Sequence, residues 1–191
     1  MPPANHRTGA TLWFTGLSGS GKTTITRALE AALQARGIPC YRLDGDLLRS
    51  GLCADLGFSR EDRRENIRRA GEAARLLSNA GLITLAAFIS PYRADRARIR
   101  EIHAAAGLPF FEVHVSTPLA VCEQRDAKGL YRRARAGDIP GFTGVSDPYE
   151  PPESPDLVIP AGEEDVGESV ERCLGFLAAA GLFGVRDRTP R

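Results

Sequence analysis

Short apolar runs alternate along the chain with segments of helical periodicity. The runs predict strands at 10–15, 39–43, 82–89, 110–115 and 157–159, and the periodic segments predict helices near 22–36, 60–80, 92–106, 118–126 and 165–180. The run at 82–89 is apolar on both alternating faces, as a central strand requires. This alternation of strands and helices predicts an α/β fold, a three-layer sandwich in which helices cover both faces of a central parallel sheet.

Length and spacing predict one domain over residues 1–191. The chain has 191 residues and 42% hydrophobic content, which suits one well-buried α/β domain and is short for two. We expect short tails at 1–9 and 184–191. The segment 122–155, between the fourth and fifth strands, is rich in Arg, Gly and Pro and too long for a simple connection. Long segments at this position usually act as lids.

The segment after the first predicted strand reads GLSGSGKTT and fits the phosphate-binding loop pattern G-x-x-x-x-G-K-[ST]. Its strand-loop-helix context predicts a P-loop NTPase-like fold that binds ATP. The glycines let backbone amides surround phosphate oxygens, Lys22 reaches the β- and γ-phosphates, and the Thr23 hydroxyl faces Mg²⁺. A flexible Gly-Ser linker is the alternative. The predicted ATP-binding residues of this loop are Gly16, Ser18, Gly19, Ser20, Gly21, Lys22, Thr23 and Thr24.

Charge and cysteine usage narrow the class of protein. The net charge of +1 gives no electrostatic case for nucleic acid or membrane, although arginines between 60 and 69 form a basic cluster suited to a small anion. Four widely spaced cysteines and three scattered histidines suggest neither zinc nor a disulfide framework, which fits a reducing cytoplasm. We find no signal-peptide pattern and no apolar run near the ~20 residues that span a bilayer.

Two carboxylates directly follow the second predicted strand. Because ligands collect at the carboxyl ends of parallel strands, we assign Asp44 to organising magnesium and its water, and Asp46 to activating an acceptor hydroxyl as base. The alternative is that Asp44 only caps the next helix while Asp46 lies solvated in its first turn.

Lysine is rare in this chain. Of the 25 lysine and arginine residues, only Lys22 and Lys128 are lysines, so Lys128 is a second candidate for a functional ammonium group. The alternative is that a compositional bias against lysine left these two at random. The segment after Lys128 is basic and contains Arg132, Arg133 and Arg135. These arginines either neutralise charge on the phosphoryl group during transfer or lie on a solvated helix. We expect Arg125 to stack on the ATP adenine.

Aromatic and basic residues away from the loop suggest the acceptor. Arg49, Arg63 and Asn66 lie near Phe58 in the sequence, and Phe142 lies in the lid segment. Arginines beside exposed aromatics suit an anion attached to a flat ring, so a nucleotide is a plausible acceptor. Either phenylalanine could equally be part of the core.

Several segments in order resemble adenylylsulfate kinase: GLSGSGKTT at 16–24, LDGD at 43–46, DLGFSREDRRENIRR at 55–69, FISPYR at 88–93 and CEQRDAKGLYRRARAGDIPGFTG at 122–144. The resemblance runs from about Ala10 to the end of the last helix. It implies ATP- and Mg²⁺-dependent phosphorylation of the 3′-hydroxyl of adenosine 5′-phosphosulfate, in sulfate activation, to give 3′-phosphoadenosine 5′-phosphosulfate and ADP.

The resemblance also implies an acceptor site, with the acceptor adenine between Phe58 and Phe142. At position 47 many members of the family have Asn, whereas this chain has Leu47. A leucine side chain cannot make the polar contact with the acceptor that an asparagine could make there. In this family the serine that matches Ser90 is often described as a phosphorylated intermediate. We favour direct transfer to the acceptor over this covalent step. We therefore expect Ser90→Ala to slow turnover without abolishing it. The implied acceptor-site residues are Asp44, Asp46, Arg49, Phe58, Arg63, Asn66, Ile89, Ser90, Lys128, Phe142 and Thr143.

Two other functions remain open at this point. One is a related P-loop kinase for another small hydroxyl compound, and the other is a silent sensor of the phosphorylated product; an Asp46→Asn change would stop turnover in an enzyme and change nothing in a sensor. As partners, the family implies a homodimer, with residues 51–53 and the helix at 60–80 as candidate contacts. It also suggests association with a sulfate adenylyltransferase.

Overall fold

The computed structural model describes residues 9–183, so most of both predicted tails lies outside the described residues. Five strands form one sheet in the order β2-β3-β1-β4-β5, and every neighbouring pair is parallel. The strands are β1 (Ala10–Thr15), β2 (Cys40–Asp44), β3 (Ile83–Ala87), β4 (Phe110–Val115) and β5 (Leu157–Ile159). The predicted α/β class and parallel sheet are therefore confirmed, with three of the five strands at their predicted bounds.

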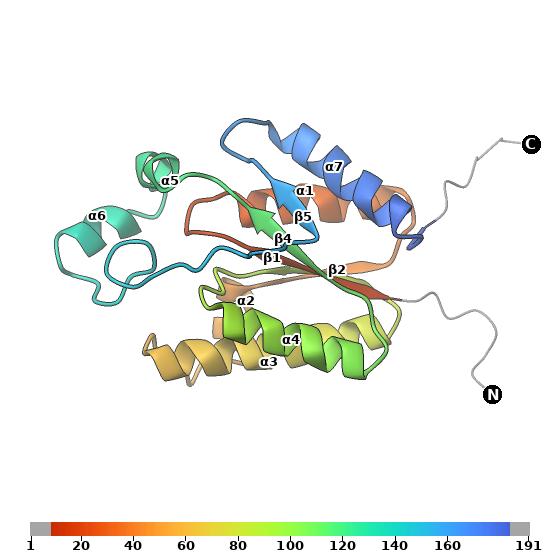
Figure 1. The fold of residues 1–191 in the computed structure, drawn as a ribbon, viewed down its shortest axis with the longest axis horizontal. Helices are drawn as coiled ribbons and strands as arrows, with labels where there is room; N and C mark the ends of the chain where they lie inside the picture. Colours follow the sequence, from red (N-terminus) through yellow and green to blue (C-terminus); the bar gives the residue numbers. More distant parts are fainter. Residues whose placement is uncertain (1–8, 184–191) are drawn as a thin grey trace, which may run out of the picture.

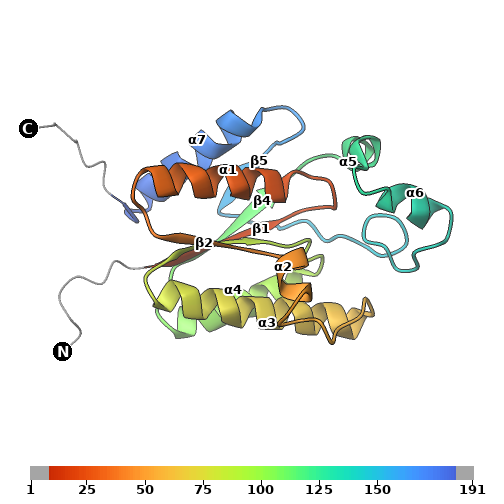
Figure 2. The same cartoon turned by 180° about the vertical axis from the view of Figure 1, so that it is seen from behind.

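Helices cover both faces of this sheet (Figures 1 and 2). On one face lie α1 (Lys22–Ala35) and α7 (Val166–Ala179); on the other lie α3 (Arg60–Asn79) and α4 (Arg93–Ala105). The short helices are α2 (Gly45–Arg49), α5 (Leu119–Arg125) and α6 (Leu130–Arg135). The predicted helix list lacks α2 and α6, since each is too short to show a periodic pattern.

The central strand β1 is buried along its whole length. Its side chains alternate between faces, so Leu12 and Phe14 belong to the core under α1 and α7, while Trp13 belongs to the core under α3 and α4. Trp13 stacks on Phe88 with ring centroids 5.1 Å apart. Burial on both faces explains why β1 reads as an unbroken apolar run rather than an alternating one.

Glycine sets the spacing of α3 and α4. A Cβ added at Gly71 of α3 would lie 2.2 Å from Cδ1 of Ile99 on α4, so the close approach of these helices requires a residue without a side chain. The spacing matters because the N-terminal ends of both helices reach the edge of the sheet where β2 and β3 end (Figure 2).

The segment 122–155 extends beyond the same edge. It contains the end of α5, all of α6 and a long loop that returns to β5, and α6 lies outside the sandwich (Figure 1). A small core of its own holds it together, built from Cys122, Tyr131, Ala134 and Phe142. Within residues 9–183, no helix has the length and apolar character needed to cross a membrane.

Candidate functional site

The phosphate-binding loop joins the end of β1 to the start of α1. Gly16, Gly19 and Gly21 have φ values of 154°, 73° and 106°. A Cβ at Gly16 would lie 2.6 Å from the carbonyl oxygen of Val115, so a side chain would not fit there. Glycine at these positions lets the loop curl back on itself and direct its amides inward, as anion binding requires.

Lys22 lies within the curl of this loop. Its Nζ donates to the carbonyl oxygens of Gly16 at 2.8 Å and Leu17 at 2.7 Å, and to Ser20 Oγ at 3.3 Å. The residue is 8% exposed, and burial lowers the pKa of Lys22 to about 7. Phosphate oxygens would restore the stabilisation of the ammonium that burial removes.

The rest of the loop is held by residues from the second half of the chain. Thr117 Oγ1 donates to Ser20 O at 2.8 Å, and Tyr131 OH of α6 donates to Ser18 O at 2.9 Å. Sequence reasoning missed both contacts, because each joins segments that are far apart in the sequence. The Tyr131 bond ties the lid segment directly to the phosphate-binding loop.

Arg125 lies beside the phosphate-binding loop, and its contact with the ATP base stays a prediction. Its guanidinium donates to Ala161 O at 2.8 Å and to Gly19 O at 3.5 Å. The group therefore bridges the loop and the segment that follows β5. These bonds fix the guanidinium plane, which an adenine ring would need for stacking.

Magnesium would depend on the nucleotide. Among residues 9–183, no group of three or more His, Cys, Asp or Glu side chains could hold a metal ion. Thr23 and Thr24 open α1 and are exposed at the mouth of the loop. A threonine hydroxyl together with phosphate oxygens fits the preference of Mg²⁺ for few protein ligands and several waters.

Asp44 ends β2 and caps α2. Its Oδ1 accepts the Leu47 N–H at 2.9 Å, and its Oδ2 accepts a hydrogen bond from Arg42. Arg42 also pairs with Glu30 of α1 at 3.4 Å. The predicted capping alternative thus describes what Asp44 does here, although each carboxylate oxygen keeps a second lone pair. Its assignment to magnesium remains a prediction.

Asp46 and Lys128 meet across the site. Lys128 Nζ lies 2.8 Å from Asp46 Oδ2, and the two side chains are 67% and 85% exposed. The residues are far apart in sequence, one in α2 and the other between α5 and α6. The structure therefore brings together two residues that the sequence indicated separately. It also places the segment 122–155 against α2.

The two phenylalanines have different environments. Phe58 is 70% exposed and carries the Arg49 guanidinium 4.2 Å from its ring centroid. Phe142 is buried in the lid core, with its ring edge-on to Tyr131 at 5.1 Å. Phe58 is thus not a core residue, and an exposed ring of this size is available for stacking.

Arg63 holds the lid loop against α3. It donates to Thr143 Oγ1 at 3.0 Å and to the carbonyl oxygens of Phe58 and Gly141. Its Nη1 also lies 3.3 Å from Asp147 Oδ2. Predicted residues Phe58, Arg63 and Thr143 are therefore neighbours, and each nitrogen of the Arg63 guanidinium already bonds to a protein oxygen.

Asn66 is one turn further along α3 and has an unused acceptor. The residue is 5% exposed, and its buried Oδ1 has no hydrogen-bond partner within residues 9–183. An orphaned carbonyl oxygen in a buried amide is costly unless a ligand or water supplies a donor. Asn66 is therefore suited to bind a donor group of a ligand.

Ser90 and Ile89 follow β3 on the same edge. Ser90 is 1% exposed and has a φ of 40°, which lies in the left-handed region that favours glycine. Its Oγ accepts the Trp13 indole N–H at 3.1 Å, and Thr15 Oγ1 donates to Ile89 O at 2.8 Å. No histidine or carboxylate within this described part of the chain bonds to the Ser90 hydroxyl, so no base is placed to make it a nucleophile.

A phosphate-binding loop after β1, carboxylates at the end of β2 and in α2, and a parallel sheet covered by helices on both faces define a P-loop kinase. The chain belongs to the adenylylsulphate kinase family, whose pattern it matches over residues 8–160. It is 57% identical over 178 residues to an adenylyl-sulfate kinase of Shewanella amazonensis, covering 93% of this chain and 88% of the relative. A Vibrio cholerae adenylyl-sulfate kinase is 58% identical over 172 residues, covering 88% and 78%.

Solved structures agree with the family. The APS kinase of Mycobacterium tuberculosis, solved with AMPPNP and APS, is 49% identical with a TM-score of 0.86, covering 89% of this chain and 98% of that one. A hexameric APS kinase from Thiobacillus denitrificans is 33% identical with a TM-score of 0.73, covering 97% of this chain and 32% of that one. A Sinorhizobium meliloti gluconokinase, at 20% identity and a TM-score of 0.58, shares the fold alone. The resemblance seen in the sequence and the predicted kinase class are confirmed.

Proposed function

We propose that this adenylyl-sulfate kinase transfers the γ-phosphoryl group of ATP directly to the 3′-hydroxyl of adenosine 5′-phosphosulfate. The observation that carries the proposal is that the predicted acceptor residues Asp46, Phe58, Arg63 and Lys128 lie at the same sheet edge as the phosphate-binding loop. A family relative has been solved with both an ATP analogue and this acceptor.

In the proposed reaction the loop amides and Lys22 hold the triphosphate while Asp46 accepts the proton of the 3′-hydroxyl. The hydroxyl oxygen forms the new bond to the γ-phosphorus, the bond to the ADP oxygen breaks, and the proton resides on Asp46. Mg²⁺ would neutralise charge on the phosphate oxygens, Thr23 would hold it, and Asp44 would orient its water. Arg125 contacts the ATP base.

The acceptor nucleotide binds between α2, α3 and the lid. Phe58 supplies a stacking surface, and the unpaired Asn66 Oδ1 accepts a hydrogen bond from an N–H or O–H of the nucleotide. The cations for the phosphosulfate come from Arg49, Arg63 and Lys128. When the acceptor enters, Lys128 leaves Asp46 and Arg63 leaves Asp147, and both bind ligand oxygens instead. Ile89, Phe142 and Thr143 complete the pocket.

The reaction is tested by following ADP release from MgATP with and without adenosine 5′-phosphosulfate, with mass analysis of the nucleotide product. We expect acceptor-dependent ADP release and a product heavier by one phosphate at the 3′ position. ADP release that ignores the acceptor, with no phosphorylated nucleotide, would contradict the proposal while leaving the ATP site in place.

Ser90→Ala separates acceptor binding from covalent catalysis. We expect turnover to fall about tenfold, because the substitution removes one hydroxyl that binds the acceptor and accepts the Trp13 N–H. Single-turnover transfer with γ-³²P-labelled ATP and denaturing analysis of the protein measures both rate and labelling. Loss of all transfer in a folded variant that binds both nucleotides normally would show that Ser90 is the phosphoryl carrier.

Assembly and location complete the proposal. Leu52 and Leu76 are 53% and 58% exposed, on the α2–α3 loop and on α3, where the sequence suggested a subunit contact. A hexameric relative shows that a member of the family assembles, and we propose that these apolar side chains form the contact of a homodimer. We retain association with a sulfate adenylyltransferase and a cytoplasmic location as proposals.

A further inference from the structure

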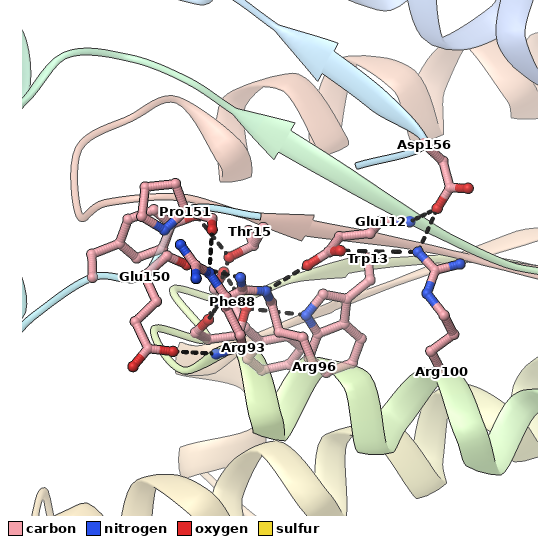
Figure 3. Close-up of polar contacts among 12 residues, drawn as sticks. Trp13, Thr15, Phe88, Arg93, Arg96, Arg100, Glu112, Glu150, Pro151 and Asp156 are labelled. Atoms are coloured by element: carbon pink, nitrogen blue, oxygen red, sulfur yellow. Dashed lines mark hydrogen bonds and ion pairs between the residues drawn. The ribbon is translucent and has the colours of Figure 1, made fainter. Parts of the chain in front are cut away.

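The first turns of α4 hold the chain segment by which the lid returns to the sheet (Figure 3). The Arg93 N–H donates to Glu150 Oε2, and its guanidinium donates to Pro151 O, both at 2.8 Å. Arg93 also pairs with Glu153 at 2.6 Å. In the other direction, the Glu150 N–H donates to Pro91 O at 2.9 Å. The trailing end of the lid is therefore fixed beside Ser90.

Arg96, one turn along the same helix, joins three segments through one guanidinium (Figure 3). Nη1 donates to Ser90 O at 2.7 Å, Nη2 donates to Glu150 O at 2.8 Å, and Nε donates to Glu112 on β4. The side chain is 2% exposed. A buried guanidinium with each nitrogen bonded in a planar fork has one orientation, so it fixes the relative positions of the groups that it binds.

Ser90 needs such support because its backbone is in the left-handed region, which a residue with a Cβ adopts at a cost. The surroundings therefore determine its conformation. Besides Arg96, Thr15 Oγ1 lies 3.4 Å from Ser90 O and 3.1 Å from Tyr149 OH. Thr15 directly precedes the phosphate-binding loop, so the start of this loop, the end of β3 and the lid return meet at one point.

We infer that Arg96 is a positioning residue that fixes Ser90 toward the acceptor and locks that position to the trailing end of the lid. The inference rests on the proposed acceptor role of Ser90. Arg93 provides the matched comparison, because it holds the same lid segment from the same helix but has no bond to Ser90 within residues 9–183. Of these two arginines, only Arg96 can act on the reaction through a bond to Ser90.

A double-mutant cycle of Arg96→Lys and Ser90→Ala tests the inference. Lysine keeps the charge near Glu112 but loses the planar fork, so we expect the KM for adenosine 5′-phosphosulfate to rise about tenfold with the KM for ATP within about twofold. The double variant should be within about twofold of Ser90→Ala, because the Oγ that Arg96 positions is already absent. Arg93→Lys should leave the acceptor KM within about threefold.

Additive effects in the double variant would overturn the inference, as would equal changes for Arg93→Lys and Arg96→Lys. A lowered melting temperature with unchanged kinetic constants of the folded Arg96→Lys enzyme would show a structural role only. If Arg96→Lys does not fold, Glu112→Ala takes its place in the cycle. Glu112→Ala removes the acceptor of the Arg96 Nε–H and so frees that end of the guanidinium. Glu112→Gln keeps an acceptor oxygen and should behave as wild type. Wild-type transfer to the acceptor is measured first, so failure of the proposed function is recognised separately.

Discussion

Replacement of Asp46 by asparagine is expected to lower kcat by about 10²–10⁴-fold while both nucleotides still bind. Asparagine has the same shape, and its amide oxygen can still accept from Lys128, whose Nζ lies 2.8 Å from Asp46 Oδ2. The variant therefore keeps the contact between the lid segment and α2 and loses the ability to take a proton. Steady-state kinetics with both substrates varied measures the change.

Asp138→Asn is the matched control for this experiment. Asp138 is an exposed lid carboxylate between α6 and Gly141, and it has no place in the proposed reaction. We expect its kinetic constants to match wild type. If Asp46→Asn kept more than about a tenth of wild-type kcat, general-base catalysis by Asp46 would be wrong, because a lost base costs at least about a hundredfold.

ATP binding is expected to take up a proton above neutral pH. Burial lowers the pKa of Lys22 to about 7 in the ligand-free loop, and bound phosphate raises it again by favouring the ammonium. Affinity therefore falls as pH rises above about 7, approaching tenfold per pH unit, since each binding event must then add a proton. A phosphate monoester has its last pKa at about 6, so the terminal phosphate of ATP should already be largely ionised there.

Calorimetry in buffers of different ionisation enthalpy measures this uptake, which we expect to rise from about half a proton at pH 7 toward one at higher pH. Lys22→Met should weaken ATP binding at least about a hundredfold, because buried charge-assisted hydrogen bonds are lost. Lys22→Arg stays charged at every pH, so any residual binding should show no proton uptake. Uptake that persisted in Lys22→Arg would assign the proton to another group.

The sequence predicted the centre of the sheet well because β1 and β3 are buried on both faces and read as apolar runs. It also located the phosphate-binding loop, since glycine and lysine at fixed offsets follow from the shape of a phosphate. Residues that act across long separations were harder. Tyr131, Thr117 and Arg96 each fix a part of the site through one or more hydrogen bonds to backbone oxygens, and no local pattern announces such bonds.

Other differences have physical causes as well. The short helices α2 and α6 lack a periodic pattern, and α2 depends on the Asp44 cap. Periodicity does not separate an exposed phenylalanine from one buried in a loop core, so the contrast between Phe58 and Phe142 needed the structure. For Arg63 the sequence indicated a cation near the acceptor, but its bonds to Thr143 and Gly141 depend on how the lid folds back.

The order of strands in the sheet has a consequence for synthesis of the protein on the ribosome. The first strand made, β1, lies at the centre and pairs on one side with β3 and on the other with β4, which ends at Val115. Arg125, beside the phosphate-binding loop, can form its hydrogen bond to Ala161 O only after the chain has been made as far as Ala161. A nascent chain thus carries its nucleotide motif from the start but completes the site that uses it only when most of the protein has left the ribosome.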